Sequence, residues 1–326
     1  MTLYPWQSAS WHLLINRLQQ GNLPHALLIH GPVGAGKASF AEQLLQRLCC
    51  EQYRSLSPDE IACLVCPACQ QFAVGSHPDI TRLSAKEGEN SIKIDAVRQM
   101  IDWLQVTPQY AGFKVALLSD ADLLTRGAAN SLLKTLEEPA SSDLIMLTTS
   151  SPAELPVTVR SRCQSINLGH YEHTLAEQWL TEQGIDDSAS ALRLASGGPL
   201  AALAAMDDEQ RKSRELLFGA WHNVLLGKAS IARSVEAVAA LPVRLCLRHF
   251  MGWTADCVKL QINTEAPITD SARKSALLQL SAVLDTETWF KVYDDLLHLY
   301  QIDSASFKTP TVLEGIFADI RLKIGQ

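Results

Sequence analysis

The sequence predicts an α/β fold, a parallel sheet with flanking helices, followed by helical domains. Two apolar runs, Val115–Leu118 and Leu144–Thr149, have the length and composition of buried parallel strands. The helical stretch Asn130–Pro139 lies between them. This strand–helix–strand order predicts a nucleotide-binding α/β core, in which the functional site lies at the carboxyl ends of the strands.

Length and composition set broad limits on this protein. A chain of 326 residues suggests two or three domains, and 47% hydrophobic with 19% charged residues is ordinary for a folded protein. The net charge of −7 argues against broad, unaided binding to nucleic acid. No apolar run approaches the roughly 20 residues of a membrane span, and the N-terminus lacks a signal-peptide pattern, so we expect a cytoplasmic protein.

The first elements surround a glycine-rich loop. We predict a helix over Trp11–Leu18, a strand over His25–His30 and a helix over Ala38–Leu48. Between the strand and the second helix, Gly31, Gly34, Gly36 and Lys37 have the spacing of a phosphate-binding loop. Glycines turn backbone N–H groups toward phosphate oxygens, and the lysine adds a positive charge.

Two positions depart from an active nucleotide hydrolase. The residue after the loop lysine should carry a hydroxyl that ligates Mg²⁺, but it is Ala38. Asp120 stands where the magnesium-binding aspartate is expected, yet Ala121 replaces the glutamate that orients the attacking water. Asp122 is displaced too far to substitute for it. We therefore expect a degenerate nucleotide site, which Thr149 completes at the end of its strand.

A cysteine-rich insertion follows the second helix. Cys63, Cys66 and Cys69 are each separated by two residues, and Cys49 and Cys50 lie upstream. Four thiolates at such spacing predict a closed, structural zinc site. Cys50 is the preferred fourth ligand, although the sequence does not separate it from Cys49.

Local signals place the remaining elements. Ile80–Leu83 is predicted as a strand, and Asp95 as the N-cap of the helix that follows. Later, Thr174 and Glu177 have the spacing of a capping box, and Gly184 should end that helix. The rest of the chain has helical apolar faces.

The stretch Asn130–Pro139, together with Ser161-Arg162-Cys163, resembles the clamp-loader family of AAA+ proteins. The cysteine insertion narrows the resemblance to bacterial clamp-loader subunits of the DNA polymerase III holoenzyme. Ala38, Ala121 and Leu200, which stands where the ATPase relatives have an arginine, favour the non-hydrolysing delta-prime group. Three further stretches fit the same group: Tyr4–Trp6, Gly75–Asp79 and Asp95–Arg98.

The resemblance implies a role for Arg162. In this family the arginine of the Ser-Arg-Cys motif reaches across a subunit boundary into a neighbour's ATP site. Arg160 is close by, but the flanking Ser161 and Cys163 fix the register on Arg162. We expect no catalysis from the chain alone, weak or absent ATP binding, and a rigid stator role in loading the β sliding clamp.

The resemblance also implies an organisation and partners. We expect an AAA+ core over 1–166 with the zinc module at about 49–70, a small helical lid over 167–207, and a helical collar over 208–326 that builds the ring. The partners would be gamma/tau and delta subunits in a heteropentamer and, through the complex, the β clamp and primer-template DNA. The alternatives are a gamma/tau-type ATPase or a zinc-dependent DNA-binding protein outside the clamp loader.

Overall fold

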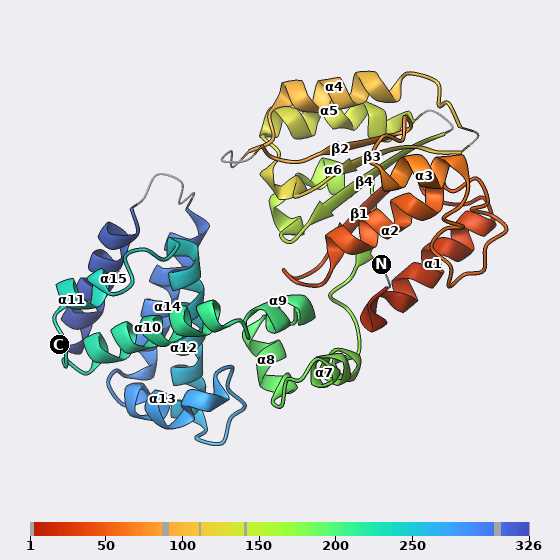
Figure 1. Cartoon of the computed structure of the whole chain (residues 1–326). Coiled ribbons are helices and arrows are strands. Elements are labelled where there is room, and N and C mark those ends of the chain that lie inside the picture. The colour runs from red at the N-terminus through yellow and green to blue at the C-terminus, as the bar shows by residue number, and fades with distance from the viewer. Residues whose placement is uncertain (1–2, 87–90, 111, 140–141, 303–307, 326) are drawn as a thin grey trace. The chain divides into compact units, whose positions relative to one another are not determined.

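The computed structural model describes residues 3–86, 91–110, 112–139, 142–302 and 308–325 (Figure 1). Two compact units are present. The first comprises Met1–Gly184 and Ser196–Ala201, and the second comprises Ile185–Ala195 and Ala202–Gln326. The expected division into core, lid and collar is finer than this, and it stays a prediction.

A five-stranded sheet forms the centre of the first unit. Its order is β2-β3-β4-β1-β5, and each neighbouring pair is parallel. Strand β1 lies between β4 and β5. The connection that follows β1 leads toward one edge of the sheet, to β2, and the one that follows β4 leads to β5 at the other edge, so the strand order reverses between β4 and β1. A ligand crevice is expected at such a point, outside the carboxyl ends of the strands. The strands are β1 (Ala26–His30), β2 (Ile80–Leu83), β3 (Lys114–Leu118), β4 (Asp143–Thr149) and β5 (Gln164–Asn167).

Helices cover both faces of this sheet, and strand residues alternate between the faces with the period of two that the pleat requires. Leu27 and Ile29 of β1 pack against α1, α2 and α3, whereas Ala26 and Leu28 pack on the side of α4, α5 and α6 (Figure 1). The helices of this unit are α1 (Ser8–Gln19), α2 (Lys37–Cys49), α3 (Pro67–Ala73), α4 (Ile94–Leu104), α5 (Arg126–Glu137), α6 (Val157–Arg160) and α7 (His173–Glu182).

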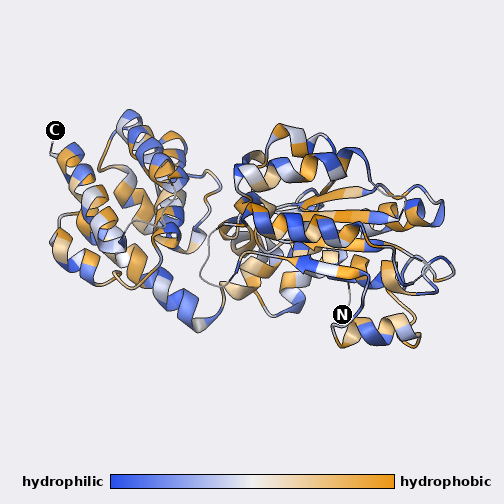
Figure 2. Ribbon diagram, turned by 90° about the horizontal axis from the view of Figure 1, so that it is seen from above, coloured by the Kyte–Doolittle hydropathy of each residue, from blue (hydrophilic) through white to orange (hydrophobic). Residues whose placement is uncertain are grey.

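The described residues of the second unit form helices joined by loops, with no strand among them. Its core contains Trp221, Trp253 and Trp289, all at most 2% exposed. In Figure 2 the strands of the first unit are mostly orange, whereas the helices of both units carry orange and blue together, as expected for elements with one buried side. The helices are α8 (Ser188–Leu194), α10 (Asp208–Leu225), α11 (Ile231–Glu236), α12 (Val243–Ile262), α13 (Lys274–Ser281), α14 (Thr286–Gln301) and α15 (Thr309–Ile324); α9 (Pro199–Ala204) begins in the first unit.

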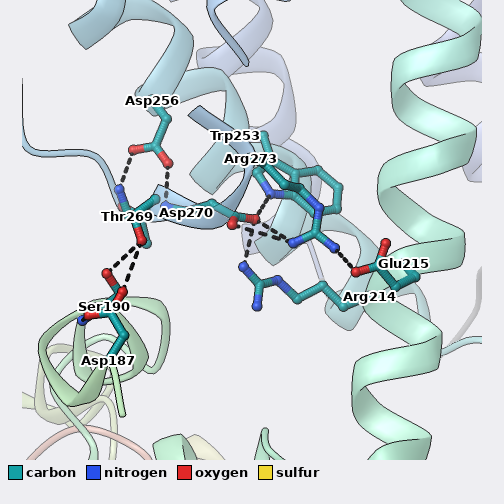
Figure 3. A network of polar contacts seen from close by, with 10 residues as sticks. Asp187, Ser190, Arg214, Glu215, Trp253, Asp256, Thr269, Asp270 and Arg273 are labelled. Atoms are coloured by element: carbon teal, nitrogen blue, oxygen red, sulfur yellow. Dashed lines mark hydrogen bonds and ion pairs between the residues drawn. The ribbon is translucent and has the colours of Figure 1, made fainter. Parts of the chain in front are cut away.

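A buried polar network braces the second unit (Figure 3). Asp270 is 1% exposed and accepts hydrogen bonds from Trp253 Nε1 at 2.9 Å and from Arg273 Nη1 at 3.0 Å. Arg214 makes a further ion pair with it at 2.6 Å. Asp256, fully buried, accepts the backbone N–H of Asp270. A buried carboxylate is tolerated only with such partners, so we assign this network to fold stability.

Two predicted helix caps are wrong. The α4 helix starts at Ile94 with Lys93 as its N-cap, and Asp95 instead lies in the first turn, where its charge complements the helix dipole. The α7 helix starts at His173 with Glu172 at the N-cap, so Thr174 is helical and caps nothing. Gly184 does follow the end of α7, with φ of 87°. No helix among the described residues is long and apolar enough to span a membrane.

Candidate functional site

The phosphate loop lies between β1 and α2, at the carboxyl end of β1. Gly34 and Gly36 adopt φ of 83° and 82°, the left-handed region that favours glycine. The α2 helix begins at Lys37. The backbone therefore has the general form that the glycine spacing predicts.

Lys37 is fully engaged within the protein. Its Nζ donates to Gly31 O and Pro32 O, both at 3.0 Å, and to Ser150 Oγ at 2.8 Å. An ammonium group has three donors, so all three are used. Burial lowers the pKa of Lys37, partly offset by the charges of Asp120 and Asp122. No donor of this lysine remains for a phosphate unless one of these bonds breaks.

The segment that begins α9 packs directly on the loop, and we call this contact the latch (residues 197–201 on residues 33–34). Leu200 donates its backbone N–H to Gly34 O at 2.9 Å. A Cβ added to Gly198 would lie 1.9 Å from Val33 O, and one added to Gly34 would lie 2.3 Å from Ala201 N. The two backbones are thus in contact, and only glycine fits at both positions.

The N-terminal segment closes the other side of the loop. Trp6 Nε1 and Gln7 Nε2 both donate to Ala35 O at 3.0 Å, and Gln7 Nε2 is also 3.1 Å from Gly36 O. Trp6 stacks on Tyr4, with ring centroids 4.9 Å apart. The loop is therefore held by protein groups on two sides, a feature that the glycine pattern alone does not reveal.

The acidic residues after β3 lie near Lys37, as the fold requires, but their arrangement is not that of a hydrolase. Asp120 is exposed, with φ of 51°, and Ala121 is fully buried in the core. The hydroxyl of Thr149 donates to the carboxylate of Asp122. The position of the missing glutamate thus faces an apolar core, and the polar group of Thr149 is already satisfied within the protein.

Arg162 presents the opposite situation. It follows the short α6 helix, and its Nη1 donates to Thr158 O at 2.8 Å. Its Nη2 forms an ion pair with Glu137 at the end of α5. About a third of its side chain is exposed, at 34%, so the guanidinium is accessible on the surface of the first unit. Cys163 is partly buried and packs against the core, which fixes the register of the loop.

Four cysteines converge beside α3. The sulfur atoms of Cys50, Cys63, Cys66 and Cys69 all lie within 4.8 Å of one another. Cys63 Sγ and Cys69 Sγ are 3.9 Å apart, close to the roughly 3.8 Å that a tetrahedral metal with 2.3 Å bonds to sulfur requires. The set therefore fits a metal ion. Cys49 is buried away from this cluster, and burial raises the pKa of its thiol.

Backbone amides favour a thiolate at part of this cluster, whereas burial raises the pKa of the Cys50 and Cys69 thiols. Leu64 adopts a left-handed φ of 63°, which turns the chain so that the N–H groups of Val65 and Cys66 donate to Cys63 Sγ. These bonds lower the pKa of Cys63 to about 6. Cys69 donates its N–H to Cys66 Sγ at 3.4 Å. Such amide–sulfur bonds stabilise the negative charge that metal-binding sulfur carries.

The structure thus brings the predicted residues into three groups within the first unit. They are the phosphate loop with Lys37, Asp120 and Thr149, the segment Ser161–Cys163, which we call the arginine loop, and the cysteine cluster. Sequence reasoning missed the contacts of Gln7 and Glu137. The stretches Tyr4–Trp6 and Asn130–Pro139 lie beside or include these residues, but in the sequence they indicated the family only.

Comparison with known proteins agrees with these features. The profile of the family described as "DNA polymerase III, delta subunit" matches residues 6–172. DNA polymerase III subunit delta' of Pseudomonas aeruginosa is 33% identical over 266 residues, which cover 80% of this chain and 78% of that protein. The subunit delta' of Escherichia coli is 36% identical over 220 residues, covering 67% of this chain and 65% of that protein, just under two thirds of its length.

A solved structure of a DNA polymerase III gamma subunit-related protein from Thermotoga maritima covers 95% of this chain and 99% of its own, with 18% identity and a TM-score of 0.46. The sequence matches carry the assignment. Because the family profile covers more than half of the chain and a delta' relative above 30% identity is matched over more than two thirds of its length, the chain belongs to the family of DNA polymerase III delta' subunits.

Proposed function

We propose that the chain is a non-hydrolysing subunit of a clamp loader, in which it serves as a stator and donates Arg162 to the ATP site of a neighbouring subunit. One observation carries the proposal. The three donors of Lys37 are used inside the protein, whereas Arg162, with about a third of its side chain exposed, uses only two of its five N–H donors there. We therefore expect the chain's own nucleotide site to be inert and Arg162 to be the group that binds a phosphate.

Missing side-chain groups and the contacts of the phosphate loop both argue against hydrolysis by this chain. Ala38 supplies no hydroxyl for Mg²⁺, and Ala121 supplies no carboxylate for water. All three donors of Lys37 are used within the protein, so a phosphate could bind this lysine only if one of those bonds broke. We therefore expect ATP binding to be weak or absent. This argues against the alternative of a gamma/tau-type ATPase, which needs all of these groups.

The arginine finger assignment rests on chemistry. A guanidinium offers a planar set of donors that matches phosphate oxygens, and an arginine supplied in trans stabilises the charge that develops during phosphoryl transfer. Arg162 lies just before the amino end of β5, whereas the phosphate loop follows the carboxyl end of β1 at the opposite end of the sheet, so Arg162 cannot serve that loop. We therefore propose that Arg162 binds the nucleotide phosphate of a second subunit, a gamma/tau ATPase.

The cysteine cluster is proposed to hold zinc. Four sulfur ligands leave no open position for a substrate, so the metal would be structural. Bound there, it would join α3 and the loop before it to the end of α2. The ligands would be Cys50, Cys63, Cys66 and Cys69, with Cys49 remaining a core residue.

The partners follow from this role: gamma/tau and delta subunits in a ring and, through that ring, the β sliding clamp and primer-template DNA. The test is reconstitution of a clamp loader from purified subunits with and without this chain. We expect a complex containing the chain by size-exclusion chromatography, and clamp loading on primed DNA that depends on it. A complete complex that loads clamps equally well without the chain would contradict the proposal. So would DNA binding by the chain alone that depends on zinc, the outcome expected of a zinc-dependent DNA-binding protein.

A further inference from the structure

The backbone around Arg162 is fixed by short-range contacts. After α6, the N–H of Ser161 donates to Val157 O at 2.9 Å, and the N–H of Arg162 donates to Val159 O at 3.1 Å. The hydroxyl of Ser161 donates to Thr158 O at 3.2 Å, and Val159 is fully buried. The position of the Arg162 Cα is therefore set by the loop, and only its side chain remains to be oriented.

Two acceptors at the ends of two helices orient that side chain. Thr158 O belongs to the last turn of α6, where helix carbonyls lack a partner within the helix. Glu137 is the last residue of α5. Nη1 of Arg162 takes the first acceptor and Nη2 takes the second. The terminal nitrogens are thus held from two sides.

This arrangement still leaves donors free. A guanidinium has five N–H donors, and two serve these contacts. Nε–H and one further N–H on each terminal nitrogen have no acceptor among the described residues, so they are available for phosphate oxygens. Glu137 can therefore stay bound while Arg162 contacts a phosphate.

Stability alone does not account for the pair. The side chains of Arg162 and Glu137 are 34% and 49% exposed, and exposed ion pairs of this kind contribute little to folding. The ion pair would have a larger effect on the rate of phosphoryl transfer, because a side chain that is oriented before the reaction raises the rate.

We propose that Glu137 is a positioning residue, which holds the guanidinium of Arg162 in the orientation that reaches the nucleotide phosphate of an adjoining subunit. This inference rests on the proposed function, because it needs Arg162 to act in trans. It assigns to the end of α5 a role in the neighbour's reaction, exerted through Arg162 and without contact to the nucleotide.

The test uses a clamp loader reconstituted with wild-type chain, Glu137→Gln, Arg162→Ala or the double variant. Glu138→Gln is the matched control, because it removes the same charge one residue further along. We expect Glu137→Gln to lower the kcat of the clamp- and DNA-stimulated ATPase about threefold with KM for ATP unchanged, because an arginine finger acts on the transition state. Glu138→Gln should match wild type, and the double variant should match Arg162→Ala.

Each other outcome has a distinct meaning. If Arg162→Ala lowers the rate and Glu137→Gln does not, Glu137 has no positioning role and the proposed function stands. If Glu137→Gln raises kcat, or slows the reaction equally when Arg162 is absent, Glu137 acts in some other way and the inference fails. If Arg162→Ala itself leaves the rate unchanged in an assembled complex, the arginine finger fails and the inference fails with it.

Discussion

The phosphate loop and the arginine loop lie in the same unit, and each carries a cation suited to phosphate. They differ in how many of the cation's hydrogen-bond donors are already used within the protein. Lys37 is half-buried and donates to two carbonyls and a serine hydroxyl, whereas Arg162 uses two of its donors, to Thr158 O and Glu137, and is about a third exposed. A motif can therefore keep its spacing after its donors have been committed to the protein itself.

The difference shows how a nucleotide-binding fold can lose its own site and serve instead as a structural subunit. In the phosphate loop, the three donors of Lys37 are used within the protein, and loop carbonyls accept hydrogen bonds from α9 and from the N-terminal segment. In the arginine loop, the local contacts fix the backbone and leave part of the side chain unpaired. Satisfied polar groups indicate stability, and accessible unpaired donors indicate binding.

The cysteine cluster extends the comparison to a third region, and it should give the largest effect. Protein purified under reducing conditions is expected to contain about one zinc per chain. Cys50→Ser should lose that metal, because four sulfurs converge at this point, and Cys49→Ser should retain it. Metal analysis by mass spectrometry measures the zinc content of both variants. Loss of zinc from Cys49→Ser alone would mean that Cys49 is the fourth ligand and Cys50 is not.

The latch predicts a stability effect at the phosphate loop. Gly198→Ala places a Cβ 1.9 Å from Val33 O, whereas Gly197→Ala meets nothing within 4 Å, although its φ is 83°. We expect Gly198→Ala to lower the free energy of unfolding by about 3 kcal/mol or more and Gly197→Ala by about 1 kcal/mol. Urea denaturation followed by circular dichroism compares them, and equal losses would mean that the latch is not a rigid contact.

Lys37→Ala should give the smallest effect. The isolated chain is expected to hydrolyse no ATP above background, with or without the lysine, because the groups for magnesium and water are missing. Millimolar ATP should raise the thermal unfolding midpoint of the wild type little or not at all, since only a ligand bound to the folded state raises it and ATP binding is expected to be weak or absent. A turnover that disappears in Lys37→Ala would contradict this reading of the loop.

The sequence predicted a large part of this molecule for identifiable reasons. Buried strands such as β3 and β4 are apolar runs, glycines mark the loop, and cysteine spacing marks the cluster. The caps of α4 and α7 were placed wrongly because Asp95 and Thr174 favour a helix start without specifying which residue has extended backbone. Contacts between distant segments, such as Gln7 with the loop and Glu137 with Arg162, depend on the tertiary fold and leave no pattern of spacing.

The central claim is that the chain contributes a cation to a neighbour and uses none of its own. The most direct measurement compares clamp loaders reconstituted with Arg162→Ala and with Lys37→Ala, with assembly checked by size and ATPase measured with clamp and primed DNA. Loss of an arginine finger costs about 10³ at the affected site, so the Arg162→Ala complex should be clearly slower, while the Lys37→Ala complex matches wild type. An assembled Arg162→Ala complex that hydrolyses ATP and loads clamps at the wild-type rate would contradict the account.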